Sequence, residues 1–378
     1  MIVVRRATLA DKPAIFEFIR AAFGDASRFN IPERWEWQYE NNPFRDPSEL
    51  PVWIAVDEDQ GKIVGQTCAM MEPLKIGADA YRVGWSVDTV VLPECRGQGI
   101  GYRLQEANHK GNEVFMSLVM SETNRRIKAR LGSAPIDPVA QFVKPVNLRP
   151  GDIWRVLAER LTPGNGPLGR LARWALRWLL LGRIIAGLLN LCLEVLDLWL
   201  MRSSDKTVVL TRVAAFGEEA DQLWRKVSPC FHALVRRDAA YLNWKFLRQP
   251  HVDYLKFIAQ RDGDICGYLI LRRGKPPMPN EGVIVDFLVS PDDAAAIRAM
   301  LVFAARRFRK EGATLIRAGT SVAPYQKCLA ELGFWKRGEL TPLFHCMNKA
   351  LNDEMARSSG VWLLGRGDHD WDPGPIPI

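Results

Sequence analysis

The fold is decided by residues 87–104, which read VDTVVLPECRGQGIGYRL. The stretch begins with mostly β-branched residues, a composition typical of a strand, and Pro93 ends the strand because proline has no N–H to donate. Glycines follow at positions 97, 99 and 101, and residues 102–110 have the apolar spacing of a helix. The order is therefore strand, glycine-rich turn and helix. Such a turn directs backbone N–H groups toward one point at the positive end of a helix, which suits a phosphate.

The spacing of the turn separates it from two common phosphate motifs. A dinucleotide fingerprint requires G-x-G-x-x-G, and a P-loop requires Lys followed by Ser or Thr, whereas Tyr102 and Arg103 follow the last glycine here. Arg96, Gly99 and Gly101 instead resemble the Arg/Gln-x-x-Gly-x-Gly/Ala loop of the GNAT superfamily of N-acyltransferases. The resemblance implies an α/β (α+β) fold with mixed central sheets flanked by helices. It also implies acetyl-CoA, or another acyl-CoA, as co-substrate.

The same resemblance assigns the residues that contact the cofactor. Backbone N–H groups of the turn would hold the pyrophosphate, and Arg96 would contact a phosphate. The end of the preceding strand would pair with the pantetheine arm. Asn124, at the start of a later helix, resembles an asparagine that contacts the cofactor, although a plain helix N-cap is an alternative. The predicted cofactor-binding residues are Val90, Val91, Leu92, Arg96, Gly97, Gln98, Gly99, Ile100, Gly101 and Asn124.

Acyl transfer from a thioester to an amine requires a neutral acceptor nitrogen and a polarised carbonyl. Members of the family often place a carboxylate on the strand before the loop, and Asp88 is the predicted catalytic residue by that resemblance. A purely structural aspartate is the alternative. Many members also have a tyrosine that protonates the departing thiolate, and residues 125–132 contain none. Compensation by Arg125 or Arg130, unassisted departure, or Tyr325 reaching across all remain open.

A repeat indicates two tandem copies of one domain. Residues 244–250 copy the W-x-aromatic-x-x-x-P pattern of residues 37–43, and residues 285–291 copy the strand and proline of residues 87–93. Two shorter apolar landmarks recur in the same order. After Pro291 the second copy has Asp292 and Asp293 in place of glycines, so we expect it to be degenerate. The predicted organisation is a GNAT domain with an intact loop (1–150), a helical insertion (151–204), a degenerate GNAT-like domain (205–350) and a C-terminal tail (351–378).

Composition indicates which ligands and which cellular compartment suit the protein. The 378 residues are 48% hydrophobic and carry a net charge of +8, which favours anionic ligands such as CoA, anionic lipid or nucleic acid. No nucleic-acid motif is present, so we expect no nucleic-acid partner. The seven cysteines show no paired spacing, which predicts no metal site and a reducing cytoplasm. The N-terminus lacks the apolar core of a signal peptide.

The insertion and the tail each have two interpretations. Residues 168–201 are apolar but interrupted by charges, too often for a transmembrane span. We expect two amphipathic helical pieces, or one helix kinked at Gly182. These would pack against the domains or a second subunit, or lie at the inner face of the cell membrane. The tail residues 368–372 (DHDWD) would be a flexible acidic end or, less readily, a metal site.

The leading functional hypothesis is an acyl-CoA-dependent N-acyltransferase, most simply an N-acetyltransferase, acting on an amine acceptor. An amino sugar or cell-surface glycan precursor is one such acceptor, because the chain also has a looser similarity to two-copy GNAT proteins of exopolysaccharide loci. A Fem-type aminoacyl transferase is a second hypothesis, although the intact loop argues against it. A non-catalytic CoA-binding or membrane-associated scaffold is a third. A homodimer is compatible with each.

Overall fold

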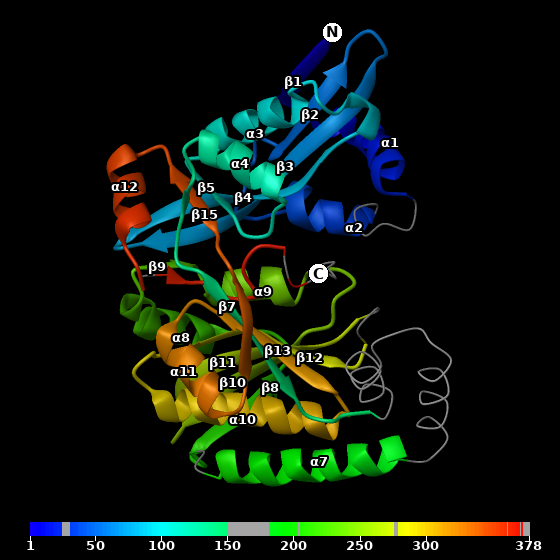
Figure 1. Ribbon diagram of the computed structural model, residues 1–378. Helices are drawn as coiled ribbons and strands as arrows, with labels where there is room; N and C mark the ends of the chain where they lie inside the picture. Colours follow the sequence, from blue (N-terminus) through cyan, green and yellow to red (C-terminus); the bar gives the residue numbers. More distant parts are fainter. Residues whose placement is uncertain are drawn as a thin grey trace.

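The structure, a computed structural model, describes residues 1–24, 31–149, 181–202, 205–275, 279–360, 362–370 and 372. The chain forms two mixed β-sheets, one above the other in Figure 1, and each is flanked by helices. The α/β class expected from the sequence is confirmed, as are its two sheets and flanking helices. Of residues 168–201, only 181–201 lie within the described part.

The first sheet has the strand order β1-β2-β3-β4-β5-β15-β6, and β9 pairs with β3 while β16 pairs with β9. The strands are β1 (Ile2–Arg6), β2 (Val52–Asp57), β3 (Lys62–Ile76), β4 (Asp79–Val91), β5 (Val114–Ser117), β6 (Ala134–Pro135), β9 (Ala233–Val235), β15 (Leu343–Cys346) and β16 (Trp362–Leu363).

Helices cover both faces of this sheet because its strands alternate. On β2, Ile54 faces the core that contains Phe18 of α1, whereas Trp53 faces the smaller core that contains Leu104 of α3. Helix α3, which follows the glycine-rich turn, therefore buries one of its sides against the sheet. The helices and helical turns are α1 (Lys12–Phe23), α2 (Pro32–Trp35), α3 (Ile100–Lys110), α4 (Glu122–Arg130), a π-helical turn Glu36–Glu40, and 3₁₀ turns Leu9–Asp11 and Pro93–Cys95.

The second sheet has the order β14-β7-β13-β12-β11-β10-β8. Its strands are β7 (Val139–Pro145), β8 (Val208–Val213), β10 (Leu255–Arg261), β11 (Asp264–Arg273), β12 (Glu281–Val289), β13 (Leu315–Thr320) and β14 (Trp335–Leu340). The remaining helices are α7 (Leu181–Leu200), α8 (Glu218–Val227), α9 (Ala239–Phe246), α10 (Ala294–Lys310), α11 (Ala323–Glu331) and α12 (Lys349–Arg357), with a 3₁₀ turn Ser228–Cys230.

The two halves exchange strands and meet through the repeated aromatic motif. β7, from the first half, lies between β13 and β14, while β15, from the second half, pairs with both β5 and β6. Trp37 and Trp244, which are equivalent in the repeat, stack with ring centroids 5.0 Å apart. The motif is therefore packing between the halves. The boundaries 1–150 and 205–350 remain an interpretation of the sequence, and each sheet takes a strand from the other range.

Candidate functional site

Strands β4 and β5 separate beside the glycine-rich turn. They pair in parallel from Val83 with Val114 to Trp85 with Met116, and no further pair follows, although β4 continues to Val91. Among the described residues, β4 therefore has a strand neighbour along 86–91 on the β3 side alone. An extended chain can bind such an edge through main-chain hydrogen bonds. The predicted pantetheine residues Val90, Val91 and Leu92 lie half-buried at this edge.

The glycine-rich turn is open. Gly99 is the N-cap of α3 in the left-handed region (φ 73°), and no side chain among the described residues caps the helix. A Cβ placed on Gly97, Gly99 or Gly101 would meet no atom within 4 Å. The first N–H groups of α3 are therefore available to an anion at the positive end of the helix.

The remaining residues of the turn are placed as follows. Gln98 is exposed, whereas Ile100 is buried and anchors the turn to the smaller core. Arg96 is exposed, and its Nε donates to Val91 O at 3.2 Å, so its guanidinium lies along the open edge of β4. The structure thus brings together the turn and the strand edge that the sequence predicted as one site.

Asp88 lies in a β-bulge of β4, on the side of the strand that pairs with β3. Cys68 pairs with Val87 and Gln66 with Val90, so Thr67 faces both Asp88 and Thr89. Asp88 adopts φ 48°, an unusual value for a residue with a side chain. Backbone held in this region is concentrated at functional sites, where the surrounding structure compensates its strain.

The Asp88 carboxylate is held by two partners. Its Oδ2 accepts hydrogen bonds from the Tyr39 hydroxyl and from Arg34 Nη1 (3.0 Å), and its Oδ1 accepts from Arg34 Nη2 at 3.3 Å. All three side chains are buried or nearly so. Burial and the neighbouring Asp88 charge raise the pKa of Tyr39 well above its usual value, so its hydroxyl keeps its proton. The role of Asp88 as a proton acceptor stays a prediction.

The C-terminal segment reaches the same cluster. Arg34 Nη2 also donates to Asp370 Oδ2 at 3.3 Å, while Asp370 Oδ1 lies 2.8 Å from His369 Nδ1. His369 Nε2 lies 3.3 Å from Ser86 O, at the point where β4 leaves β5. His369 shares with Asp88 a positive φ, 63°. The sequence predicted these two residues only as part of a flexible tail or a metal site, and it did not place them near Asp88.

The expectation of a flexible acidic tail is wrong for the residues that the structure describes. Asp368 is buried and accepts from Arg237 at 2.9 Å, and Asp372 pairs with Arg272 at 2.8 Å. Burial raises the pKa of Asp368 to about 6, although Arg237 opposes this shift. In the described ranges no group of three His, Cys, Asp or Glu residues is placed to hold a metal ion. The tail acids instead balance buried arginines.

The equivalent gap in the second half is filled. β12 and β13 pair in parallel only as far as Val283 with Arg317. The C-terminal segment enters where they part: Gly365 bridges Thr320, and Ser321 N donates to Leu364 O at 2.9 Å. Beside it the Tyr325 hydroxyl bonds both the N–H and the carbonyl of Val289. Tyr325 is therefore held within the second half rather than reaching across to the first.

The N-terminus of α10, the helix that follows β12, is also occupied by a side chain. The side chain of Asp293 accepts from Ala296 N at 3.0 Å, which caps α10, and it pairs with Arg261 at 2.9 Å. A carboxylate thus occupies the position that the glycines leave open at α3. These contacts favour the interpretation that the second half does not bind CoA in the usual way.

Helix α4 carries Lys128, a candidate site residue that the sequence analysis did not single out. Ser121 is its N-cap and accepts from Asn124 N, so the alternative reading of Asn124 as a plain N-cap is wrong. Lys128, one turn beyond Asn124, is buried, and its Nζ donates to Ser117 Oγ at 2.7 Å. Ser117 is the β5 residue directly after the last β4–β5 pair. Burial, with a smaller contribution from Arg125, lowers the pKa of Lys128 to about 7.

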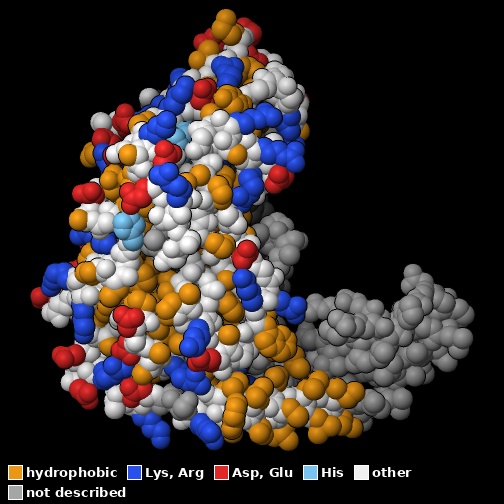
Figure 2. Space-filling model, turned by 60° about the vertical axis from the view of Figure 1, so that its left-hand side comes forward, with side chains coloured by type: hydrophobic (Ala, Val, Ile, Leu, Met, Phe, Trp, Pro, Cys, Tyr) orange, Lys and Arg blue, Asp and Glu red, His pale blue; other side chains and the backbone are white. Residues whose placement is uncertain are grey.

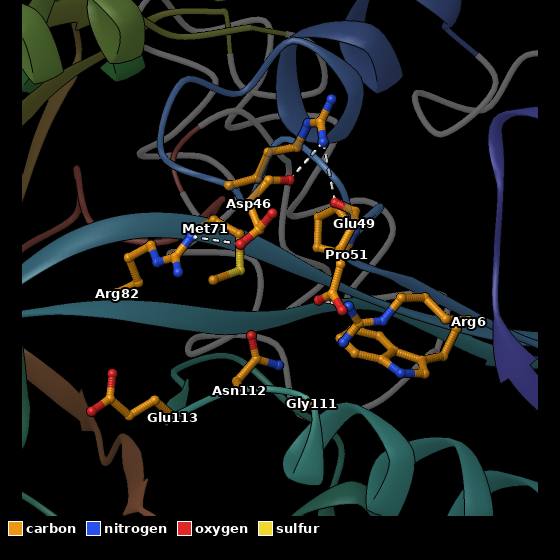
Figure 3. A pocket seen from close by; sticks show the side chains of 11 residues that line it. Arg6, Asp46, Glu49, Pro51, Met71, Arg82, Gly111, Asn112 and Glu113 are labelled. Carbon is orange, nitrogen blue, oxygen red and sulfur yellow. Dashed lines mark hydrogen bonds and ion pairs between the residues drawn. The ribbon is translucent and has the colours of Figure 1, made fainter.

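A charged cavity of about 120 Å³ lies at the other end of α3, beside Gly111 and Asn112. Figure 3 shows Arg82 pointing toward Asp46, 3.7 Å away, and Arg6 beside Glu49. Its arginines are thus matched by carboxylates of the same cavity. It lies a whole helix length from Gly99, and the balanced charge does not mark it as a phosphate site.

Comparison with known proteins identifies the first half. Residues 3–113 match the family described as "Acetyltransferase (GNAT) domain", and no curated protein sequence matches the chain. The matched residues 3–113 form a GNAT-type domain, the fold of acyl-CoA-dependent N-acyltransferases.

Solved structures extend the likeness to the whole fold. A GCN5-related N-acetyltransferase from Anabaena variabilis has a TM-score of 0.60 at 11% identity, over 92% of this chain and 73% of that one. One from Kribbella flavida gives 0.58 at 12%, over 92% and 71%. Saccharomyces cerevisiae N-myristoyltransferase with bound myristoyl-CoA gives 0.52 at 12%, over 91% and 79%. At these identities the likeness shows a shared fold of two GNAT-type sheets.

Proposed function

We propose that the protein transfers an acetyl group from acetyl-CoA to an amine, and that the first half carries the reaction. The observation that carries this proposal is the uncapped glycine-rich turn at the end of β4, beside the edge that β5 leaves free. In the second half Asp293 and the C-terminal segment fill both positions. Pyrophosphate at α3 and pantetheine along residues 90–92 would direct the thioester toward the β4 bulge.

Asp88 is the candidate acceptor of the amine proton. The acceptor nitrogen attacks the thioester carbonyl, and the tetrahedral intermediate then expels the thiolate as the nitrogen loses its proton. Arg34 and Tyr39 hold the carboxylate in one orientation at the bulge. Such pre-orientation reduces the reorganisation that the reaction requires.

Lys128 is the candidate donor of a proton to the thiolate. Its ammonium lies where β4 and β5 part, and a pKa of about 7 matches the working pH of a general acid. The departing thiolate would take a proton from Nζ, and solvent would return one afterwards. This assignment supplies the acid that the absent tyrosine would provide.

Binding of the co-substrate is the first test. We expect calorimetric titration with acetyl-CoA to show one site per chain, and Gly99→Glu to abolish it because a carboxylate would occupy the phosphate position. Gly312→Glu is the matched control, since Gly312 also has a positive φ and open space around it. Failure of the wild type to bind acetyl-CoA or any longer acyl-CoA would overturn the proposal.

Turnover with a panel of amines tests the chemistry. Amino sugars related to cell-surface glycans are the first class to screen. We expect Asp88→Asn to lower kcat by roughly 10²–10⁴, whereas Asp286→Asn, its equivalent in the second half, should affect stability alone. Equal effects of the two variants on stability, with no loss of kcat in either, would identify Asp88 as structural.

A further inference from the structure

Helix α7 turns two polar side chains, Asn190 and Asp197, inward beside apolar residues such as Ala186. Asn190 bonds both the N–H (2.6 Å) and the carbonyl (3.0 Å) of Leu148, while buried Asp197 pairs with Lys144 at 2.6 Å and with Arg309. A helix at a protein surface ordinarily places polar residues such as these outward. Removing Asp197 from its two cations would leave buried charges unpaired, so these contacts fix the rotation of the helix.

The outward side of α7 is apolar along its length. Figure 2 shows this surface as a continuous hydrophobic strip at the lower edge of the molecule. More than half of the large hydrophobic side chains exposed in the described residues belong to this one helix, so the strip is a concentration rather than scatter. Its centre consists of Ile184, Leu188, Leu191, Val195, Leu198 and Trp199, each between 57% and 64% exposed.

The size of the strip argues against a second copy of the chain as its occupant. A helix of 20 residues is about 30 Å long and about 10 Å wide, so its outward half presents roughly 500 Å². Stable interfaces bury about 800 Å² on each partner. A dimer through α7 alone would fall short of that area.

The charges around the strip favour a lipid surface. Exposed Arg183 and Arg202 lie at its two ends, and Arg306 of α10 lies beside Leu198, while Glu194 is the one exposed acid of α7. The Trp199 ring packs 5.6 Å from the Arg202 guanidinium. Apolar residues with a terminal tryptophan and flanking arginines are typical of helices that lie in the membrane interface.

We propose that the outward side of α7 docks the protein onto an anionic lipid bilayer, with the helix lying in the plane of the interface. No helix in the described residues is both long and apolar enough to cross a membrane. The docking depends on α7 and not on the acyltransfer proposed above, so either proposal stands without the other.

Vesicle flotation tests this proposal with the full-length protein. We expect wild type to float with vesicles that contain phosphatidylglycerol and to bind pure phosphatidylcholine more weakly. Leu188→Asp combined with Val195→Asp should lower binding to the anionic vesicles by more than about tenfold, because it places two charges in the apolar strip. Trp335→Asp combined with Val209→Asp is the matched control, since both residues are exposed hydrophobics on the second sheet.

Three outcomes would overturn the proposal. The first is a wild type that does not float, and the second is an α7 variant that floats as well as the control. The third is light scattering that shows a dimer in wild type and a monomer in the α7 variant, without vesicle binding by either. Circular dichroism of each variant verifies that it remains folded.

Discussion

At the scale of single residues, Asp88 and Asp286 show how equivalent positions diverge. Each is held by an arginine and a tyrosine: Arg34 and Tyr39 in the first half, Arg237 and Tyr268 in the second. Only the first of the two aspartates has a left-handed backbone. Because the side-chain partners are alike and β12 also has a bulge beside Asp286, the left-handed backbone of Asp88 and the open gap beside it distinguish the candidate catalytic position.

Lys128→Met tests the candidate general acid by its pH dependence. We expect kcat of wild type to fall as pH rises through about 7, because the donor loses its proton there, and the variant to lack this limb and to have a kcat lower by roughly 10²–10⁴. KM for acyl-CoA should change little. Lys327→Met, at an exposed site of the equivalent helix α11, should keep the wild-type profile.

Lys128→Met should also change how the free energy of unfolding depends on pH. The pKa of Lys128 is lower when folded than its usual 10.5, so between about 7 and 10.5 the unfolded chain binds the extra proton. This residue therefore makes the free energy of unfolding rise with pH across that window. Lys128→Met should remove the rise in denaturant titrations. Identical pH profiles of rate and stability in variant and wild type would contradict the assignment.

At the scale of elements, the start of a helix decides whether a half can hold a phosphate. α3 begins with Gly99 and an open turn, whereas α10 begins with Asp293, which caps the helix and pairs with Arg261. The strand before each helix parts from its parallel neighbour in both halves. The halves thus share a topology but differ in what occupies the position where the strands part.

Two neighbouring glycines of the turn should respond oppositely to alanine. Gly99→Ala places a side chain at φ 73° and should destabilise by about 1 kcal/mol, with weaker acyl-CoA binding. Gly101→Ala lies in the first turn of α3, has open space around it and should stabilise by up to about 1 kcal/mol. Thermal unfolding of both variants checks the signs, and a stabilised Gly99→Ala would contradict this account of the turn.

At the scale of the whole molecule, the C-terminal segment joins the two halves. It passes through the gap between β12 and β13 and then reaches Arg34 beneath β4. Arg237 is central, since it binds both Asp286 and Asp368 and is fully buried. The acidic tail is therefore part of the interior.

Arg237→Met should destabilise the protein by about 3–5 kcal/mol, because it leaves two buried carboxylates without their cation. Denaturant unfolding measures the change, and limited proteolysis should then cleave the tail more readily. Arg236→Met is the control: that neighbour is exposed, and its partner Asp238 keeps its capping hydrogen bond from Tyr241 N, so we expect a change of no more than about 1 kcal/mol. Similar effects of the two variants would show that the tail is not held by Arg237.

The sequence by itself determined the features that depend on neighbours along the chain. The glycine-rich turn, the strand before it and the helix after it follow from residues 87–104, because turns and caps are decided by local backbone preferences. The repeat predicted two similar sheets, since equivalent patterns adopt equivalent structures. These features suffice for the fold class and for the candidate phosphate position.

Only the tertiary structure decided which distant residues share the site. Asp370 shares Arg34 with Asp88 across most of the chain, and Lys128 is buried against Ser117. β7 of the first half lies in the second sheet, and β15 of the second half lies in the first sheet. The apolar spacing of the sequence does not predict such contacts, because burial and ion pairing depend on how the sheets and helices pack together. The outward apolar side of α7 is similar: the sequence shows an amphipathic helix, but buried ion pairs decide which side faces out.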